Sequence, residues 1–98
     1  GLDPGLTAIV ATSDVLALGA IQTVHSRHQR VPEDVSVTGF DGIRGAFEAR
    51  LTTVQQPVVD KGRHAARLLL DPAVHAEPRR VVLPTSFVPG ATSGPPRM

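Results

Sequence analysis

Two apolar runs on either side of one helical segment restrict the fold of this chain more than any other feature. Residues 7–12 are apolar without polar alternation, which is typical of a strand covered on both faces. Residues 15–28 carry apolar side chains at helical spacing, and residues 35–40 form a second apolar run. A strand, a helix and a strand at this spacing make a βαβ unit with parallel strands and a right-handed crossover. The sequence therefore predicts an α/β fold with a Rossmann-like parallel sheet.

Weaker signals extend this pattern to the end of the chain. We expect a short helix at 43–49, a strand at 51–54 and a helix at about 57–71. Residues 80–88 predict a strand that a proline interrupts. The last ten residues, 89–98, hold three prolines and two glycines, and the composition predicts a flexible tail.

Composition excludes several classes of protein. The 98 residues have a formal net charge of only +1, which argues against a nucleic-acid-binding arm. The absence of cysteine excludes disulfides and thiolate catalysis, and it fits a cytoplasmic protein. No apolar run approaches the roughly 20 residues that cross a bilayer, so no membrane partner is expected. Because the chain starts at Gly1 and enters a strand almost at once, we expect it to continue an upstream part of a longer protein.

Polar side chains follow the two parallel strands where each of them ends. Ser13 and Asp14 follow the first strand, and Asp41 follows the second. Ligands of open parallel sheets bind beyond the carboxyl ends of the strands, so these residues should share one edge. A carboxylate there accepts two hydroxyl donors at once, which suits a sugar, a ribose or a polyol. The alternative is structural: Asp14 caps its helix, and Asp41 stabilises a turn beside Gly42.

Other constellations are incomplete. His25 and His28 lie three residues apart on one helix, but no further ligand completes a metal site. The glycines at 39, 42 and 45 match neither the dinucleotide fingerprint nor a phosphate-binding loop. No nucleophile elbow or pair of helical carboxylates is present. The sequence predicts a protein that is not an enzyme and that has no cofactor and no metal.

Four segments in order resemble the lactose-repressor/galactose-repressor family of bacterial transcription regulators. They read TAIVATSDVLALGA, RVPEDVSVTGFDGI, LTTVQQPVVDKGRHAARLLL and RRVVLPTSFV. The resemblance implies the C-terminal part of an effector-binding domain, which is similar to two-lobed periplasmic binding proteins. Residues 1–88 would form this part, with the helix at about 57–71 in the other lobe. The family's DNA-binding helix-turn-helix has no counterpart here, so operator DNA would be bound only through that missing domain.

The resemblance also implies roles for single residues. Asp41 stands in the family's Gly-Phe/Tyr-Asp motif, whose Asp hydrogen-bonds the effector. Ser13 stands where many relatives have an effector-contacting Asn, and Asp14 matches the Asp that follows it. Gln56 matches a polar position at the hinge between the lobes. The loop from Asp41 to Leu51 is about two residues shorter than in relatives, which leaves the effector class open.

The resemblance further implies a homodimer. Leu16, Leu18 and Phe47 would contribute to its interface, unless they only fill the core of their own lobe. The predicted function is that of the effector-sensing part of a repressor, which binds a sugar or polyol between two lobes and thereby alters operator affinity. The alternatives are a sugar-binding protein of a transport system and, with less support, an α/β enzyme that uses Asp41 as acid or base. We do not expect the 98 residues to fold stably alone.

Overall fold

The computed structural model describes residues 5–71 and 80–98, and it divides the chain into two compact units. Unit 1 consists of residues up to Gln55 together with Ser86–Met98. Unit 2 consists of Gln56–Thr85. The predicted domain that covers residues 1–88 therefore draws on both units. The units are described separately below.

Unit 1 begins with the predicted βαβ motif. Strand β1 (Ala8–Val10), helix α1 (Asp14–Ser26) and strand β2 (Ser36–Thr38) follow one another, and β1 pairs with β2 in parallel. Ala8 is opposite Ser36 in this pair, which sets the register. The α/β prediction and the parallel pairing are thus confirmed. Each strand is shorter than its apolar run because only three residues of each make the ladder.

The other edge of β2 continues toward a second strand pair. After helix α2 (Arg44–Glu48) comes strand β3 (Thr53–Gln55), which pairs antiparallel with β4 (Ser86–Val88). The Gly39 N–H donates to the Thr52 carbonyl at 3.0 Å, which joins β2 to the start of β3. Among its described residues, unit 1 therefore contains two two-stranded sheets, a parallel pair of β1 and β2 and an antiparallel pair of β3 and β4.

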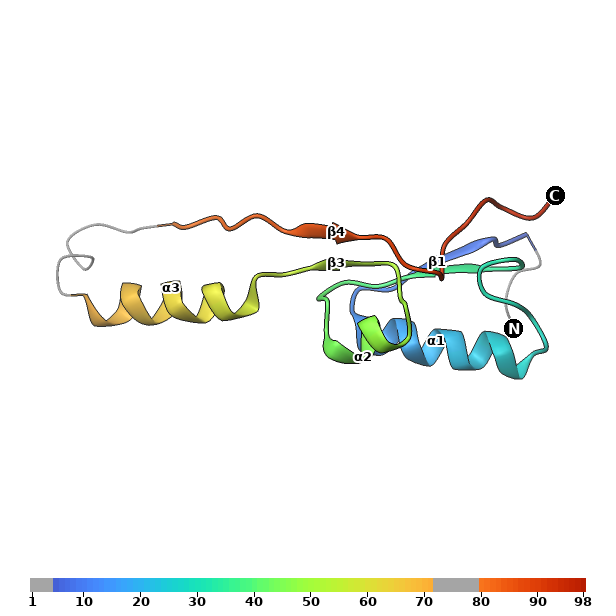
Figure 1. Cartoon of the computed structure of the whole chain (residues 1–98), viewed down its shortest axis with the longest axis horizontal. Helices are drawn as coiled ribbons and strands as arrows, with labels where there is room; N and C mark the ends of the chain where they lie inside the picture. The colour runs from blue at the N-terminus through green and yellow to red at the C-terminus, as the bar shows by residue number, and fades with distance from the viewer. Residues whose placement is uncertain (1–4, 72–79) are drawn as a thin grey trace. The chain divides into compact units, whose positions relative to one another are not determined.

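Helices α1 and α2 lie on the same side of the sheet (Figure 1). Small and branched side chains fill the space between these layers, and they are buried: Ala17, Val24, Val35, Val37, Ala46 and Leu51. On the other side, Val10 is 80% exposed, and Val54 and Phe87 help line a groove of about 500 Å³. The expectation of a β1 covered on both faces is not met by the described residues, because one crossover places its helix on only one face.

Residues 89–98 do not form the flexible tail that their composition predicts. The Val37 N–H donates to the Thr92 carbonyl at 2.8 Å, so this segment lies along the edge of β2 that does not pair with β1. The buried Thr92 hydroxyl donates to the Val37 carbonyl and accepts from the Thr52 N–H, at 2.7 and 2.9 Å. Threonine hydroxyls supply partners for backbone N–H groups in this region, since Thr52 Oγ1 also accepts from the Gly90 N–H at 3.1 Å. The last segment is therefore integrated into unit 1.

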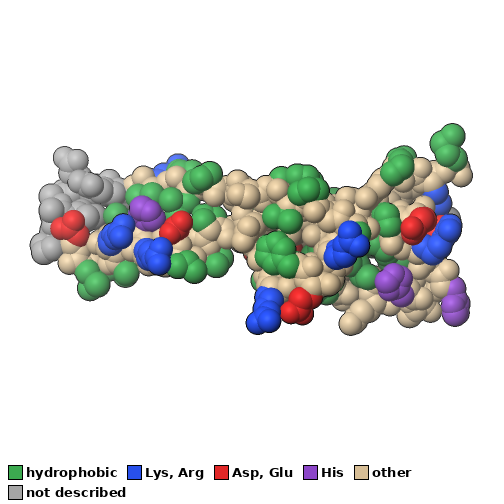
Figure 2. Space-filling view, viewed as in Figure 1, with side chains coloured by type: hydrophobic (Ala, Val, Ile, Leu, Met, Phe, Trp, Pro, Cys, Tyr) green, Lys and Arg blue, Asp and Glu red, His purple; other side chains and the backbone are tan. Residues whose placement is uncertain are grey.

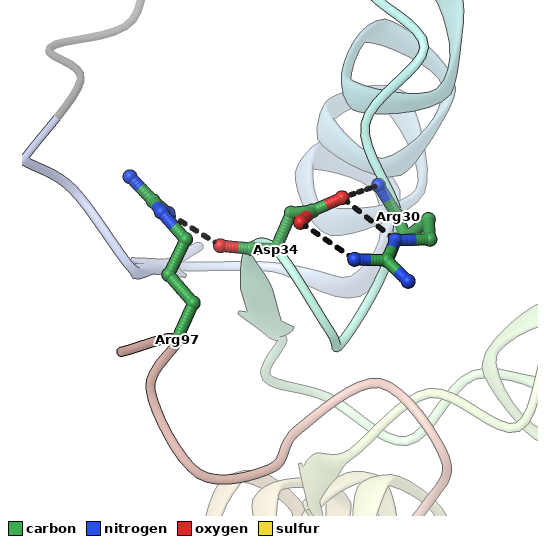
Figure 3. Close-up of polar contacts among 3 residues, drawn as sticks. All are labelled: Arg30, Asp34 and Arg97. Atoms are coloured by element: carbon green, nitrogen blue, oxygen red, sulfur yellow. Dashed lines mark hydrogen bonds and ion pairs between the residues drawn. The ribbon is translucent and has the colours of Figure 1, made fainter.

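The charged turn that contains Arg30 and Asp34, before β2, also binds Arg97 of the C-terminal segment (Figure 3). The Arg30 guanidinium and backbone N–H donate to the Asp34 carboxylate, at distances between 2.7 and 3.1 Å. Arg97 Nη1 donates to the backbone carbonyls of Asp34 and Leu6, at 2.6 and 2.8 Å. The hydrogen bonds from the Arg30 side chain and backbone lower the pKa of the Asp34 carboxyl below its ordinary value.

This lowered pKa predicts a pH-dependent contribution to stability. A carboxyl whose pKa is lower in the folded state stabilises the fold above its unfolded pKa, roughly pH 4, and loses that contribution as the pH falls through the folded pKa. Asp34→Asn should therefore lower the melting temperature of the intact protein at pH 7, and the difference from wild type should shrink below about pH 4. Glu48→Gln, which breaks the exposed Arg44–Glu48 pair, is the matched control with little expected effect. A difference that stays constant with pH would contradict the assignment.

Unit 2 contains helix α3 (Val58–Leu70). None of its residues is buried within the described part of the chain, and Val58, Val59, Leu69 and Leu70 are each more than 60% exposed. A helix with so many exposed apolar residues needs a partner surface to be stable. The placement of this helix in a second lobe of a longer protein stays a prediction.

The helices of the described residues are also short relative to a bilayer. None of them has the length and apolar character that crossing a membrane requires.

Candidate functional site

The candidate site is built where β1 and β2 end. Both strands run in the same direction, so Ser13 and Asp14 after β1 lie at the same edge as Asp41 after β2. The Asp14 N–H donates to the Phe40 carbonyl at 2.8 Å, which joins the two strand ends directly. The structure therefore brings together three of the four predicted ligand-binding residues.

Asp14 is fully buried, and its carboxylate contacts protein groups. Its Oδ2 accepts hydrogen bonds from the Gly42 and Ile43 N–H groups, at 2.7 and 2.8 Å. Its Oδ1 accepts from the Thr53 hydroxyl at 2.5 Å. A buried carboxylate is tolerated only with such partners, and the N-terminus of α1 adds a favourable dipole. Asp14 thus links the loop after β2 to strand β3.

Gly39 makes room for this carboxylate. A Cβ atom at residue 39 would collide with Asp14 Oδ1 and would lie 2.9 Å from Leu51 Cδ2. Glycine is therefore required here by close packing. The role of Thr53 and the packing of Gly39 were not predicted from the sequence, since neither residue belongs to a catalytic or binding pattern.

Asp41 has an unusual backbone conformation. Its φ is +129°, in a region that L residues rarely adopt, and such strain costs about 1–3 kcal/mol. Its N–H donates to the Val54 carbonyl at 2.8 Å, and Asp41 forms an isolated parallel bridge with Gln55. The residue is half-buried. Backbone strain of this kind occurs most often at functional sites, and the predicted contact between Asp41 and an effector stays a prediction.

The next residue shows why the turn is tight. Gly42 has a φ of +77°, and a Cβ atom there would lie 2.6 Å from Gln55 Cγ. The turn around Asp41 is therefore pressed against the end of β3. Residues 40–43 are called the Asp41 turn below.

Ser13 acts as the N-cap of α1. Its hydroxyl accepts a hydrogen bond from the Leu16 N–H at 3.2 Å, and the residue is half-buried. A hydroxyl that accepts from the helix can still donate a proton to another group. The predicted contact between Ser13 and a ligand stays a prediction.

Gln56 belongs to unit 2, so it is described apart from the other three residues. Its side-chain oxygen accepts a hydrogen bond from the Lys61 ammonium. A spacing of five residues across the start of α3 permits this contact, which was not predicted from the sequence. The predicted role of Gln56 at a hinge stays a prediction.

The three predicted interface residues lie on α1 and α2. Leu16 is 59% exposed and Phe47 is 45% exposed, whereas Leu18 is half-buried and lies 3.7 Å from the position of a Cβ built on Gly45. Figure 2 shows hydrophobic side chains at the surface in the region of α2. Leu16 and Phe47 are thus available to a partner, and Leu18 mainly fills the space between the helices.

The described residues hold no group of three His, Cys, Asp or Glu side chains that could bind a metal ion. The candidate site comprises the buried carboxylate of Asp14, the half-buried Asp41 and the hydrogen-bonding groups around them. Such a site at the strand ends of an α/β unit is typical of proteins that bind small polar ligands.

Comparison with known proteins identifies the class of protein to which this chain belongs. The model of the periplasmic binding protein-like domain matches residues 2–93. The chain is 48% identical, over 97% of its length, to an HTH-type transcriptional regulator of Mycolicibacterium smegmatis. It therefore belongs to the periplasmic-binding-protein-like domain family, in the form that LacI-family transcription regulators carry.

Solved structures agree with this assignment. The complex of the transcriptional regulator CelR with cellobiose superposes with a TM-score of 0.84 and 37% identity, over 92% of this chain. A LacI-family regulator from Enterococcus faecium with bound ribose superposes with a TM-score of 0.80 and 31% identity, over 93% of this chain. The recognised family and the two-lobed type of fold are thereby confirmed.

The matched regions are only parts of these proteins. The chain spans 26% of the M. smegmatis regulator, and 29% and 35% of the two solved chains.

Proposed function

We propose that this chain is the C-terminal part of the effector-binding domain of a transcription regulator whose effector is a sugar or polyol. The effector would bind between two lobes and change the affinity of the intact protein for operator DNA. Operator binding would require a DNA-binding domain outside these 98 residues. The protein would act in the cytoplasm, as a sensor and not as an enzyme.

The observation that carries this proposal is the Asp41 turn. It presents a carboxylate, in a strained conformation, at the edge where the parallel strands end. One carboxylate accepts hydrogen bonds from two neighbouring hydroxyl groups, which is the pattern that sugars offer. Sugars also occupy two similar regulators, cellobiose in one and ribose in the other.

Regulation follows from a difference in affinity between two arrangements of the lobes. A ligand shifts such an equilibrium only by as much as it prefers one arrangement. Asp41 is the proposed effector contact of unit 1, and Gln56 is proposed separately as a hinge residue of unit 2. An effector that binds Asp41 more tightly in one arrangement of the lobes would favour that arrangement.

Two other functions are compatible with parts of this structure, a transport protein and an enzyme. A sugar-binding protein for transport would share the fold, and an upstream signal peptide rather than a helix-turn-helix would identify it. The similarity to transcription regulators favours the first function. An α/β enzyme would need a catalytic partner for Asp41, and the similarity to transcription regulators gives this function no support.

A ligand screen of the intact protein tests the proposal. Ribose, glucose, cellobiose and sucrose at millimolar concentration should include at least one that raises the melting temperature by several degrees, because a bound ligand stabilises the native state. The same sugar should change the affinity for the operator in a gel-shift assay. If no sugar or polyol shifts either quantity, the proposed effector class is wrong.

We also propose that the intact protein is a homodimer, with Leu16, Leu18 and Phe47 at the interface. Leu16 and Phe47 are large exposed apolar residues on two adjacent helices, and the half-buried Leu18 lies beside them, which supports this proposal. Sedimentation at micromolar concentration should show a dimer, and the double variant Leu16→Glu, Phe47→Glu should be monomeric. Ser26→Glu adds one such charge at an exposed position of α1 and should remain dimeric. A wild-type monomer would reject the proposal.

A further inference from the structure

We propose that Asp14 is the positioning residue that holds Asp41 in its strained conformation, and that Asp14 does not itself contact the effector. The inference rests partly on the proposed function, since Asp41 is the effector contact there. Its structural half is independent of any ligand, because it concerns how one buried carboxylate determines the backbone conformation of a neighbouring residue.

Asp14 binds the Asp41 turn on both sides of Asp41. Its N–H donates to the carbonyl of Phe40, the residue before Asp41. Its Oδ2 accepts from the N–H groups of Gly42 and Ile43, the two residues after Asp41. Three of the hydrogen bonds that shape this turn therefore end on one residue.

The N–H of Asp41 itself is held by the residues of β3. The Asp41 N–H donates to the Val54 carbonyl, so Asp41 itself cannot rotate without losing that bond. With both flanking peptides held by Asp14, relaxation of φ from +129° to a negative value would break at least one of these bonds. Bonds from backbone N–H groups to a carboxylate are the stronger, charge-assisted kind. They can therefore maintain a conformation that an Asp residue would not adopt alone.

Thr53 fixes the carboxylate of Asp14 in turn. Its hydroxyl donates to Oδ1, which leaves Oδ2 to face the turn. Asp14 is 0% exposed, and both its oxygens accept hydrogen bonds within unit 1. Its carboxylate makes none of the ion pairs found among the described residues. A ligand could reach this carboxylate only after the turn had opened. Asp14 thus acts on the effector through the orientation of Asp41.

A double-mutant cycle without ligand tests the positioning role. Asp41→Gly relieves backbone strain only where the strained conformation is enforced. Urea unfolding of the intact protein measures the folding equilibrium constant with and without Asp41→Gly. The factor by which Asp41→Gly raises this constant should be at least about threefold larger in the wild-type background than in the Asp14→Ala background. The entropic effect of glycine on the unfolded chain is the same in both backgrounds and cancels. Effects that agree more closely than this would overturn the proposal.

Two variants make the cycle secure. Gly19→Ala lies on α1 with no atom within 4 Å of the added methyl group, so it should combine additively with Asp14→Ala. If Asp14→Ala does not fold, Asp14→Asn replaces it, because its oxygen can keep one amide bond while the charge is lost. The same threefold criterion then applies.

A binding measurement separates this proposal from the proposed function. With whichever of ribose or cellobiose binds the intact wild type, Asp14→Asn should weaken binding by about tenfold or more, although the residue is buried. It should weaken binding little further once Asp41 is Ala, because the two residues act through one contact. Full additivity would overturn the positioning role. Failure of both sugars to bind wild type would count against the proposed function, and the ligand-free cycle would still decide the role of Asp14.

Discussion

Asp41→Ala in the intact protein is expected to weaken effector binding by about 10- to 100-fold and to leave operator affinity without effector unchanged. A hydrogen bond to a charged group contributes about 1.5–3 kcal/mol, which corresponds to this range. The operator would be bound by a separate domain, so its affinity should not depend on one residue at the sheet edge. Titration of the effector, followed by heat or fluorescence, and a gel-shift assay measure the two quantities.

Two further variants separate the carboxylate from the turn. Asp41→Asn keeps an acceptor and the length of the side chain, so it should lose less affinity than Asp41→Ala. Asp41→Gly should lose as much affinity as alanine while unfolding less readily, because glycine adopts a φ of +129° without strain. If induction by the effector survives in the alanine variant, the carboxylate only stabilises the turn.

Gly39→Ala is expected to lower the free energy of unfolding by about 2–5 kcal/mol. The new methyl group would collide with the carboxylate of Asp14 and come within 2.9 Å of Leu51 Cδ2. Overpacking of this kind costs about 1–3 kcal/mol, and displacement of a buried, hydrogen-bonded carboxylate adds a comparable amount. Urea unfolding of the intact protein measures the change as a shift of the transition midpoint.

Gly19→Ala is the matched control for this substitution. It adds the same methyl group to α1, where no atom lies within 4 Å, and it should stabilise the protein by up to about 1 kcal/mol because alanine favours the helix. Equal effects of the two substitutions would show that the region around Gly39 relaxes freely, and this would contradict the packing described here.

The βαβ motif could be predicted because its signals are local. The apolar runs at 7–12 and 35–40 and the capping residue Ser13 each report a backbone conformation within a few residues. The shared edge of Ser13, Asp14 and Asp41 followed from the direction of the strands alone. The ends of the helices were harder to predict from the sequence. His28 and Arg50 adopt the left-handed conformation that usually marks a glycine after a helix.

Contacts between residues far apart in the sequence could not be predicted from these local signals. Composition predicted a flexible segment at 89–98. Thr92 is nevertheless buried, and it forms hydrogen bonds with Thr52 and Val37, which precede it in the sequence by 40 and 55 positions. Thr53 gave no sign that its hydroxyl would bind Asp14, since a threonine in an apolar strand is common. These partners meet only when β3 and the last segment take their places beside β2.

The type of fold, the family resemblance and the position of Asp41 at the end of a buried strand could all be inferred from the sequence. These depend on periodicity and on short motifs, which act over a few residues. The positive φ of Asp41 and the burial of Asp14 beneath its turn became visible only in the three-dimensional arrangement. A strained backbone persists only when distant groups supply its hydrogen bonds, and a sequence does not state which distant groups will meet.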